Sequence, residues 1–449
     1  MVKVKTQHFH AKIAVMPRWT YTLLLCLLLP FALLKLVWRA FRQPEYLRHV
    51  PERFGFYRSP CPAQPVIWLH AVSVGETRAT APLVALLRLR YPQHRILMTH
   101  ATPTGREAGE QLFGNDVLRC YLPYDLPGAM ARFLDHFQPR VGLLMETELW
   151  FNLIAACEKR GVPLMLVNAR LSERSARGYA RLGKLVEEGL ERLTRIAAQT
   201  EDDAQRLHKL GARKVAVTGN LKFDVTPPPE MQAKGEALRR LFGQERPIFL
   251  AASTRDGEES LVLDAVAAAN VPGLLTVIVP RHPQRFNEVA GILEKRGISY
   301  VRRSGLQDAD PSPQPSPARG EGVGGREFSV VLGDSMGEMF AYYAACDVAF
   351  IGGSLLPLGG QNLIEACAMG KPVLIGPHTW NFEAVAQSAL AAGAALRVED
   401  AAALGAKVRE LFADNELRER MSRQALAFSG SHSGASQRVM AVIEETLAS

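Results

Sequence analysis

The chain has 449 residues, of which 47% are hydrophobic and 22% are charged, and its net charge is +8. This composition is typical of a globular protein of two or three domains and excludes a collagen-like, disulfide-scaffold or polytopic membrane protein. The first 60 residues hold ten Lys and Arg against two acidic residues. The rest of the chain is therefore neutral, which argues against a nucleic-acid-binding protein.

Residues 19–40 are mostly apolar, and we predict that they form a membrane-anchoring helix. A spanning helix needs roughly 20 apolar residues, so the segment is short, and Pro30 is expected to kink it. A cleaved signal peptide is disfavoured because no small-x-small cleavage site follows. A buried core helix is the remaining alternative. The basic residues that follow favour a cytoplasmic position for the main body.

The cysteine pattern gives no sign of a metal centre. The six cysteines are scattered, with no C-x-x-C pair and no histidine at metal-ligand spacing. They fit a reducing compartment and core packing. A D-x-D sequence at Asp308 and Asp310 precedes a Pro- and Gly-rich stretch, and we interpret it as a coincidence. We therefore expect no metal site.

From residue 64 onward, short apolar runs alternate with helical stretches, which predicts parallel sheets covered by helices on both faces. The runs in the first half are 65–69, 95–99, 141–145, 163–167, 195–198 and 214–217. Those in the second half are 247–251, 274–279, 330–332, 348–351 and 372–375.

The predicted fold class is α/β with two Rossmann-like, doubly wound domains. We expect an N-terminal domain over 41–226, a linker region over 227–246 that begins with three prolines, and a C-terminal domain over 247–449. A low-complexity insert over 308–326 interrupts the second domain. Two such domains with a hinge between them place a ligand cleft at the facing carboxyl ends of their strands.

Two turns in the first half carry candidate site residues. Ser73 and Gly75 follow one strand and open a helix whose free N–H groups can face a ligand. Glu146 and Glu148 follow another strand, where two carboxylates suit a cleft better than a core. Each turn has a simpler explanation as helix capping, which leaves both alternatives open.

Three turns in the second half resemble phosphate- and ribose-binding turns. A helix N-terminus after a glycine-rich turn binds phosphate well, and an acid at such a place can bind a ribose diol. Because neither a P-loop nor a dinucleotide fingerprint occurs, we infer a nucleotide-sugar donor. The residues concerned are Arg281 and His282; Met336, Gly337 and Glu338; and Asn362, Leu363, Ile364 and Glu365.

Seven motifs together resemble those of the 3-deoxy-D-manno-octulosonic acid (Kdo) transferases of lipopolysaccharide assembly. In chain order they read ERFG, WLHAVSVGE, METELW, STRDGEE, PRHPQRF, GDSMGE and GGSLLPLGGQNLIE. The resemblance covers roughly residues 16–430. It implies a GT-B glycosyltransferase that moves Kdo from CMP-Kdo to lipid IVA, the lipid A precursor, with inversion. It also implies a cell inner membrane location and the use of no metal or other cofactor.

The resemblance also implies roles for single residues. Glu52 is the general base that deprotonates the acceptor hydroxyl. Ser73, Gly75, Glu146 and Glu148 line the acceptor or Kdo side. The CMP-contacting positions are those of the three second-half turns given above, from Arg281 to Glu365. The family usually has His where this chain has Gln361, which cannot titrate. The insert over 308–326 is outside the family pattern.

Two other classes of function remain open on the sequence. A transferase that uses a nucleoside diphosphate sugar would share the fold and much of the glycine chemistry. A membrane-tethered binding protein without activity would keep the fold alone. Nucleotide preference and product formation distinguish these classes.

Overall fold

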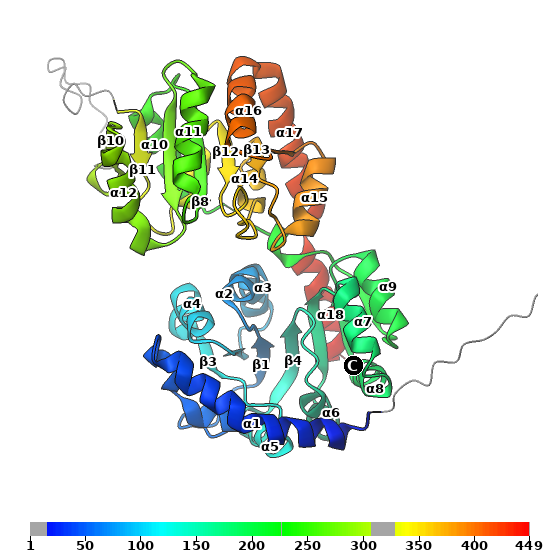
Figure 1. Cartoon of the computed structure of the whole chain (residues 1–449). Helices are drawn as coiled ribbons and strands as arrows, with labels where there is room; N and C mark the ends of the chain where they lie inside the picture. Colours follow the sequence, from blue (N-terminus) through cyan, green and yellow to red (C-terminus); the bar gives the residue numbers. More distant parts are fainter. Residues whose placement is uncertain (1–15, 226, 307–327, 449) are drawn as a thin grey trace, which may run out of the picture. The chain divides into compact units, whose positions relative to one another are not determined.

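The computed structural model describes residues 16–225, 227–306 and 328–448, which form two compact units (Figure 1). Unit 1 contains the chain up to Asp224 and again from Ser433, and unit 2 contains Val225–His432. Each unit has a seven-stranded sheet in which all paired strands are parallel. The predicted fold class is therefore confirmed. The expected insert over 308–326 lies outside the described residues.

The strands of unit 1 follow the order β3-β2-β1-β4-β5-β6-β7. The strands are β1 (Val66–His70), β2 (Arg95–His100), β3 (Val117–Tyr121), β4 (Pro139–Met145), β5 (Leu164–Ala169), β6 (Arg195–Ala198) and β7 (Val215–Val217). The helices are α1 (Arg18–Ala40), α2 (Val74–Ala79), α3 (Ala81–Arg90), α4 (Pro103–Phe113), α5 (Pro127–Phe137), α6 (Phe151–Arg160), α7 (Glu173–Ala180), α8 (Lys184–Arg192), α9 (Glu201–Lys209) and α18 (Ala435–Ala448). Short 3-10 helices are η1 (Pro44–Leu47), η2 (Val50–Phe54), η3 (Gly114–Asp116) and η4 (Leu221–Phe223).

Unit 2 has the strand order β10-β11-β9-β8-β12-β13-β14. The strands are β8 (Ile248–Thr254), β9 (Leu275–Pro280), β10 (Tyr300–Arg302), β11 (Val330–Leu332), β12 (Val348–Ile351), β13 (Val373–Ile375) and β14 (Ala395–Arg397). The helices are α10 (Pro229–Phe242), α11 (Glu258–Ala269), α12 (Phe286–Lys295), α13 (Met339–Ala345), α14 (Ile364–Ala368), α15 (Glu383–Ala391), α16 (Ala401–Ala413) and α17 (Asn415–His432). Two 3-10 helices are η5 (Pro283–Arg285) and η6 (Arg303–Gly305).

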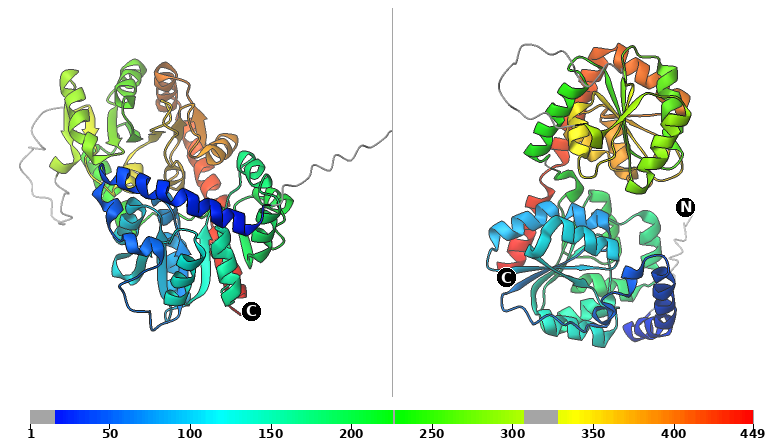
Figure 2. Two further views of the ribbon diagram at one scale, coloured as in Figure 1. Left: turned by 60° about the horizontal axis from the view of Figure 1, so that its bottom comes forward. Right: turned by 90° about the vertical axis from the view of Figure 1, so that its left-hand side faces the viewer.

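Alternate residues of each strand pack on opposite faces of the sheet, which explains why the strands read as continuous apolar runs. In β1, Trp68 joins the core formed with α5, α6, α8 and α9, whereas Ile67 and Leu69 join the core formed with α3 and α18. All five residues of β1 are buried. A strand that is covered on both faces must be apolar along its whole length. Figure 2 shows helices on both sides of each sheet.

Three strands lie outside the predicted runs, and all three occupy outer positions of their sheets. β3, β10 and β14 are edge strands. An edge strand pairs on one side only and needs fewer apolar residues, so its sequence signal is weak. β10 has no fully buried residue, and β3 carries Arg119 at its centre.

The chain is divided differently from the expected domains. Residues 227–246 were expected to link the domains, but they contain α10, because a proline at the first helical position is compatible with a helix and helix-forming residues follow it. α10 packs against α13 of unit 2, and Gly235 allows the close approach to Ala341 and Ala344. The C-terminal segment groups with unit 1 because Val439 and Ile443 of α18 are buried in its core.

α1 runs unbroken through Pro30 and packs along unit 1. Tyr21 donates a hydrogen bond to Asp125 (2.8 Å), and Thr22 donates one to Asn152 of α6 (3.0 Å). The opposite side of α1 exposes large apolar residues, among them Leu27 (61%). By length and composition α1 could cross a membrane. Figure 2 shows α1 lying across unit 1.

Candidate active site

Apart from Glu52, the predicted site residues follow the carboxyl ends of strands, and each sheet has one point at this edge where its strand order reverses. In unit 1 this point lies between β1 and β4, and in unit 2 it lies between β8 and β12. Loops that leave neighbouring strands in opposite directions open a crevice there, and doubly wound sheets bind ligands in it. Each unit therefore has a candidate site of its own at this edge.

Ser73 and Glu76 form a capping box at the start of α2. The Ser73 hydroxyl donates to Glu76 Oε1 (2.8 Å) and accepts from the Glu76 N–H (3.3 Å), while the N–H of Val72 donates to Glu76 Oε2 (2.8 Å). The capping explanation of this turn is thus correct for Ser73. Gly75 is exposed, and a Cβ there would meet only the Ser73 hydroxyl within 4 Å.

A cluster of carboxylates surrounds this turn. Burial raises the pKa of Glu76. Burial, together with the charges of Glu76 and Glu146, raises the pKa of Glu148 to about 7. Lys222 from η4 lies 3.5 Å from Glu146 Oε1. Glu146 has a φ of 56°, a conformation that a non-glycine residue adopts only where its surroundings enforce it.

The raised pKa of Glu148 is a property that general bases share. A carboxylate whose pKa is close to neutral accepts a proton readily and still occurs ionised at physiological pH. Like-charge neighbours and burial are the usual means of reaching such a pKa. The sequence motif METELW identified Glu146 and Glu148, but the contributions of Glu76 and Lys222 depend on the folded chain.

Glu52 lies elsewhere in unit 1, at the edge strand β3. Its Oε2 accepts hydrogen bonds from the Arg106 guanidinium (2.7 Å) and from the N–H of Tyr121 (2.8 Å), and its Oε1 lies 3.3 Å from Nδ1 of His49. The ring of Tyr121 lies under the guanidinium groups of Arg106 and Arg53. Glu52 therefore holds η2 against β3.

The structure does not bring Glu52 together with the carboxylate cluster. Two strand spacings separate β3 from β1, which amounts to about 10 Å across the sheet. The role of Glu52 as the base remains a prediction from the resemblance. Glu148, whose pKa is raised to about 7, is a second candidate.

In unit 2, Arg281 follows β9 and meets the loop after β12. Its Nε donates a hydrogen bond to Gln361 Oε1 (3.3 Å). The side chain of His282 is largely exposed. Its partial burial and the charges of the surrounding arginines, first of all Arg281, lower its pKa. A guanidinium and a primary amide at this edge suit a phosphate ester. Gln361 thus supplies a donor and an acceptor where the family usually has an imidazole.

Glu338 is held by cations of unit 2. It is in contact with Lys234 of α10, Arg303 (3.3 Å) and the Ser335 hydroxyl. Burial alone would raise its pKa, but Lys234 and Ser335 lower it. Glu338 therefore fixes the turn, whereas Met336 is 54% exposed and Gly337, with a φ of +81°, has open space around it.

The turn before α14 is ordered by its own side chains. Asn362 accepts from the N–H of Ile364 (3.0 Å) and donates to Glu365 (3.2 Å). The side chains of Leu363 and Ile364 are buried, so a ligand can reach these two residues only through the main chain. Asn362 and Glu365 remain partly exposed.

Glu258 joins the two loops at the switch point of unit 2. Its carboxylate accepts hydrogen bonds from the N–H groups of Arg255 (2.9 Å), Gly353 and Leu355 (3.0 Å). The motif STRDGEE contains Glu258, but the sequence does not show that its side chain is fully buried. Ser253, with a φ of 56°, marks the same sharp turn.

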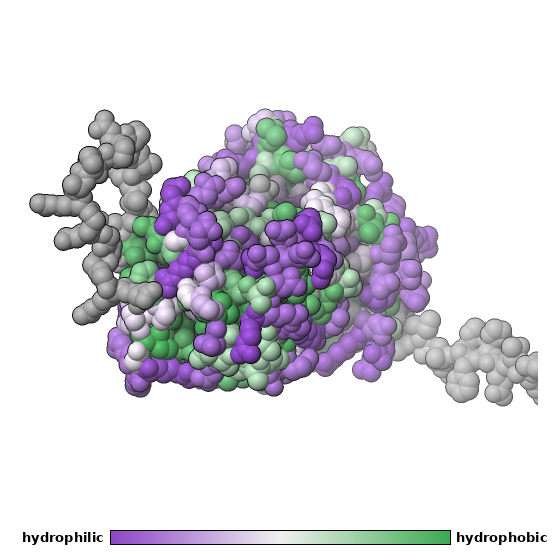
Figure 3. Space-filling model, turned by 90° about the horizontal axis from the view of Figure 1, so that it is seen from above, coloured by the Kyte–Doolittle hydropathy of each residue, from purple (hydrophilic) through white to green (hydrophobic). Residues whose placement is uncertain are grey.

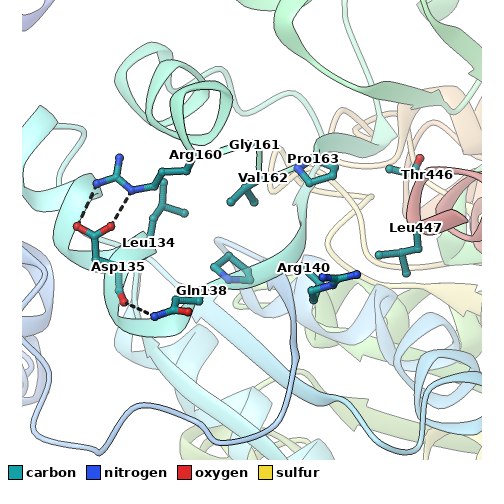
Figure 4. A pocket seen from close by; sticks show the side chains of 11 residues that line it. Leu134, Asp135, Gln138, Arg140, Arg160, Gly161, Val162, Pro163, Thr446 and Leu447 are labelled. Carbon is teal, nitrogen blue, oxygen red and sulfur yellow. Dashed lines mark hydrogen bonds and ion pairs between the residues drawn. The ribbon is translucent and has the colours of Figure 1, made fainter. Parts of the chain in front are cut away.

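A cavity of about 550 Å³ lies at the opposite edge of the unit 1 sheet. It is lined by Pro139 and Pro163, at or just before the starts of β4 and β5, and by Leu447 of α18. Figure 4 shows the Asp135–Arg160 ion pair at its side (2.8 Å). Since ligands bind at the carboxyl ends of such strands, we assign this cavity no role in the chemistry.

The comparisons with known proteins identify the family of the chain. The family model "3-Deoxy-D-manno-octulosonic-acid transferase (kdotransferase)" matches residues 48–225, and "Glycosyl transferases group 1" matches residues 324–428. A 3-deoxy-D-manno-octulosonic acid transferase of Bordetella pertussis is 45% identical over 96% of this chain and 100% of its own length. The chain belongs to the Kdo transferase family.

The Kdo transferase assignment holds for nearly the whole chain. The Haemophilus influenzae transferase is 38% identical over 96% of this chain and 99% of its own length. The protein is therefore a glycosyltransferase, as the seven motifs predicted.

Solved structures confirm the fold of this Kdo transferase. A glycosyltransferase from Rickettsia africae has a TM-score of 0.56 at 14% identity, over 86% of this chain and 99% of its own. A UDP-GlcNAc 2-epimerase from Neisseria meningitidis also has a TM-score of 0.56, at 16% identity, over 85% of this chain and 100% of its own. At these identities the likeness concerns the fold alone.

Proposed function

We propose that this Kdo transferase moves Kdo from CMP-Kdo to the lipid A precursor lipid IVA in lipopolysaccharide biosynthesis. The observation that carries the proposal is the 45% identity to a named Kdo transferase over 96% of the chain. Two switch-point sites, one per unit, supply places for a donor and an acceptor.

The donor is proposed to bind unit 2. Arg281 neutralises the phosphate of the leaving CMP, and Gln361 orients the Arg281 guanidinium. Asn362 and Glu365, which are partly exposed, can bind the ribose hydroxyls. His282, Met336, Gly337 and the main chain at Leu363 and Ile364 complete the predicted contacts. Fixed cationic and N–H groups stabilise the charge that develops on the leaving phosphate.

The acceptor is proposed to bind unit 1. A general base removes the proton from the acceptor hydroxyl, whose oxygen attacks the anomeric carbon of Kdo opposite the phosphate. The carbon–oxygen bond to CMP breaks as the new glycosidic bond forms, which inverts the anomeric centre. Two candidates for this base are Glu52, by the family resemblance, and Glu148, whose pKa is raised by burial and by the charges of Glu76 and Glu146.

The protein is proposed to sit on the cytoplasmic side of the inner membrane through α1. Tyr21 and Thr22 bind α1 to unit 1, and the apolar residues on its other side would enter the lipid. A helix that is apolar on one side and bound to protein on the other can lie in the membrane–water interface. On the face shown in Figure 3, by contrast, hydrophilic residues cover most of the visible surface.

Product analysis and nucleotide preference test the donor and acceptor together. The enzyme is incubated with CMP-Kdo and lipid IVA, and mass spectrometry should find lipid IVA that carries Kdo. CMP should raise the melting temperature more than UDP or GDP. Stabilisation by UDP alone would favour a diphosphate donor, and the absence of product at any enzyme concentration would favour a binding protein.

Substitution of the two candidate bases decides between them. Glu148→Gln should lower kcat about 10²- to 10⁴-fold, because it removes proton acceptance, while CMP affinity stays unchanged. Glu52→Gln keeps an acceptor for the Tyr121 N–H but loses the ion pair with Arg106, so it lowers kcat by a similar factor if Glu52 is the base and affects mainly stability if it is not. A large loss of kcat in Glu52→Gln with wild-type kcat in Glu148→Gln would assign the base to Glu52.

A further inference from the structure

A second cavity of about 1150 Å³ lies within unit 1, away from the switch point. One wall is formed by η1, η2 and the segment after them, from Leu47 to Gln64. The other wall comes from β2, β3, α4 and α5, with Leu97, Leu118 and Phe137 among the lining residues. A cavity of this size is as large as the sites that hold drug-sized ligands, about 300–1,000 Å³.

The inner lining of this cavity is apolar. Leu97, Cys120 and Phe137 are almost completely buried, and Leu118 is half-buried beside them. Such a lining offers water few hydrogen-bond partners and suits a hydrocarbon chain. This inner part does not suit the hydroxyl groups of a ribose.

The same cavity is strongly cationic. Five arginines line it, and among its described lining residues Glu52 is the acidic one, already paired with Arg106. Arg119 donates to the carbonyl oxygens of Gly114 and Val117, and burial and the charge of Arg106 lower its pKa. An anionic group would relieve this accumulation of like charge. The arginines are Arg48, Arg58, Arg95, Arg106 and Arg119.

The cavity begins a few residues after the apolar helix α1 ends. η1 packs against α1, and the Arg39 guanidinium of α1 lies 5.6 Å from the ring centre of Tyr46 in η1. Exposed apolar residues continue from α1 to the cavity wall: Phe41 is 84%, Leu47 is 50% and Phe56 is 56% exposed. A lipid next to α1 therefore has a short apolar path to the cavity.

We propose that this cavity binds an acyl chain of an anionic lipid, with the chain against Leu97, Leu118 and Phe137 and a phosphate against the arginines. The shared chemistry is a phosphate-bearing, acylated amphiphile. Two sources can supply it: a membrane phospholipid, or the acylated acceptor itself. The second source rests on the proposed function, whereas the first does not.

The test measures lipid retained by the full-length protein in detergent. The protein is incubated with phosphatidylglycerol, phosphatidylcholine or lipid IVA, and native mass spectrometry counts the lipid that stays bound. Leu118→Trp fills the cavity, and Arg58→Glu reverses a charge at its wall. Leu112→Trp on α4 and Arg420→Glu on α17 are matched exposed controls outside the cavity.

The wild type and both controls should retain at least about ten times more phosphatidylglycerol or lipid IVA than Leu118→Trp and Arg58→Glu do. All proteins should retain less phosphatidylcholine than phosphatidylglycerol. Melting temperatures show whether each variant is folded. If Leu118→Trp does not fold, the test rests on Arg58→Glu, which lies at an exposed position. Lipid retention by folded Arg58→Glu and Leu118→Trp equal to that of the wild type, or none by the wild type, would overturn the proposal.

Kinetics identify the source of the lipid. If the acceptor occupies the cavity, KM for lipid IVA rises in Arg58→Glu while KM for CMP-Kdo does not. If a phospholipid occupies it, retention of phosphatidylglycerol falls and both KM values stay at the wild-type level. A wild-type enzyme that makes no Kdo product would contradict the proposed function and would leave the phosphatidylglycerol result standing.

Discussion

At the scale of single residues, Glu148 shows how a strand end changes the pKa of a side chain. It follows β4 at the point where the sheet order reverses, and its neighbours Glu76 and Glu146 come from two different turns. The sequence contains each carboxylate in a recognisable motif. Their mutual repulsion, and the approach of Lys222, exist only after β1 and β4 have paired.

The raised pKa of Glu148 predicts a pH dependence of stability. The folded state holds the proton up to a pH of about 7, whereas the unfolded chain releases it near pH 4.5, so stability due to this group falls as the pH rises between these values. Glu148→Gln should therefore gain stability relative to the wild type at pH 8 but not at pH 4. Urea unfolding at both pH values measures this difference.

The control for this experiment is Glu236→Gln, at an exposed position of α10 in unit 2. It should shift the free energy of unfolding equally at both pH values. An equal shift in Glu148→Gln would mean that the Glu148 carboxyl titrates as it does in the unfolded chain.

Glu52 marks the limit of residue-level inference. Its motif ERFG could be recognised from the sequence, and a catalytic role followed from the resemblance. Its partners Arg106 and Tyr121 are far from it in the chain, so no local pattern could indicate that both would use the same carboxylate oxygen. A hydrogen-bonded carboxylate and a free base look alike in a sequence.

At the scale of elements, burial decided what the sequence could predict. Central strands such as β1 are buried on both faces and were predicted within a residue or two. Three of the four edge strands, β3, β10 and β14, lie outside the predicted runs, whereas the fourth, β7, was predicted from the apolar run over 214–217. The helix α10 was assigned to a linker because of a run of three prolines, the last of which is the first residue of the helix.

α18 is an element whose contribution can be measured. Ile443 is fully buried in the core shared with Ile67 and Leu69. Ile443→Ala should lower the free energy of unfolding by about 2–5 kcal/mol, because it leaves a cavity in that core. Gln437→Ala, at an exposed position of the same helix, should change it by less than about 0.5 kcal/mol.

Chemical denaturation of both variants measures this difference. An effect of Ile443→Ala as small as that of Gln437→Ala would show that α18 is not packed on unit 1 in solution.

At the scale of the whole molecule, α1 is proposed to hold the enzyme at the lipid surface. Leu27→Glu places a charge on the exposed apolar side of α1 and should weaken binding to vesicles containing phosphatidylglycerol by about tenfold or more. Leu89→Glu, at a 75% exposed position of α3, is the control. Co-sedimentation with vesicles measures both, and equal binding of the two variants would contradict the anchoring role of α1.

The domain plan could be predicted from the sequence only in outline. Two sheets follow from the two series of apolar runs. The return of the chain to unit 1 does not follow from the sequence. α18 has the composition of any amphipathic helix, and only its packing with residues of β1, such as Ile67, places it in unit 1.

This return makes unit 2 an insertion within unit 1. The chain leaves unit 1 after Asp224 and comes back at Ser433, and the Asp224 carboxylate accepts hydrogen bonds from the N–H groups of Gly434 (2.6 Å) and Ala435 (3.1 Å). The Asp224 side chain thus connects the segment that leaves unit 1 to the segment that returns to it. A single proteolytic nick in either crossing leaves the other intact, so the two halves stay covalently joined, and only a double cut releases unit 2 as a separate fragment.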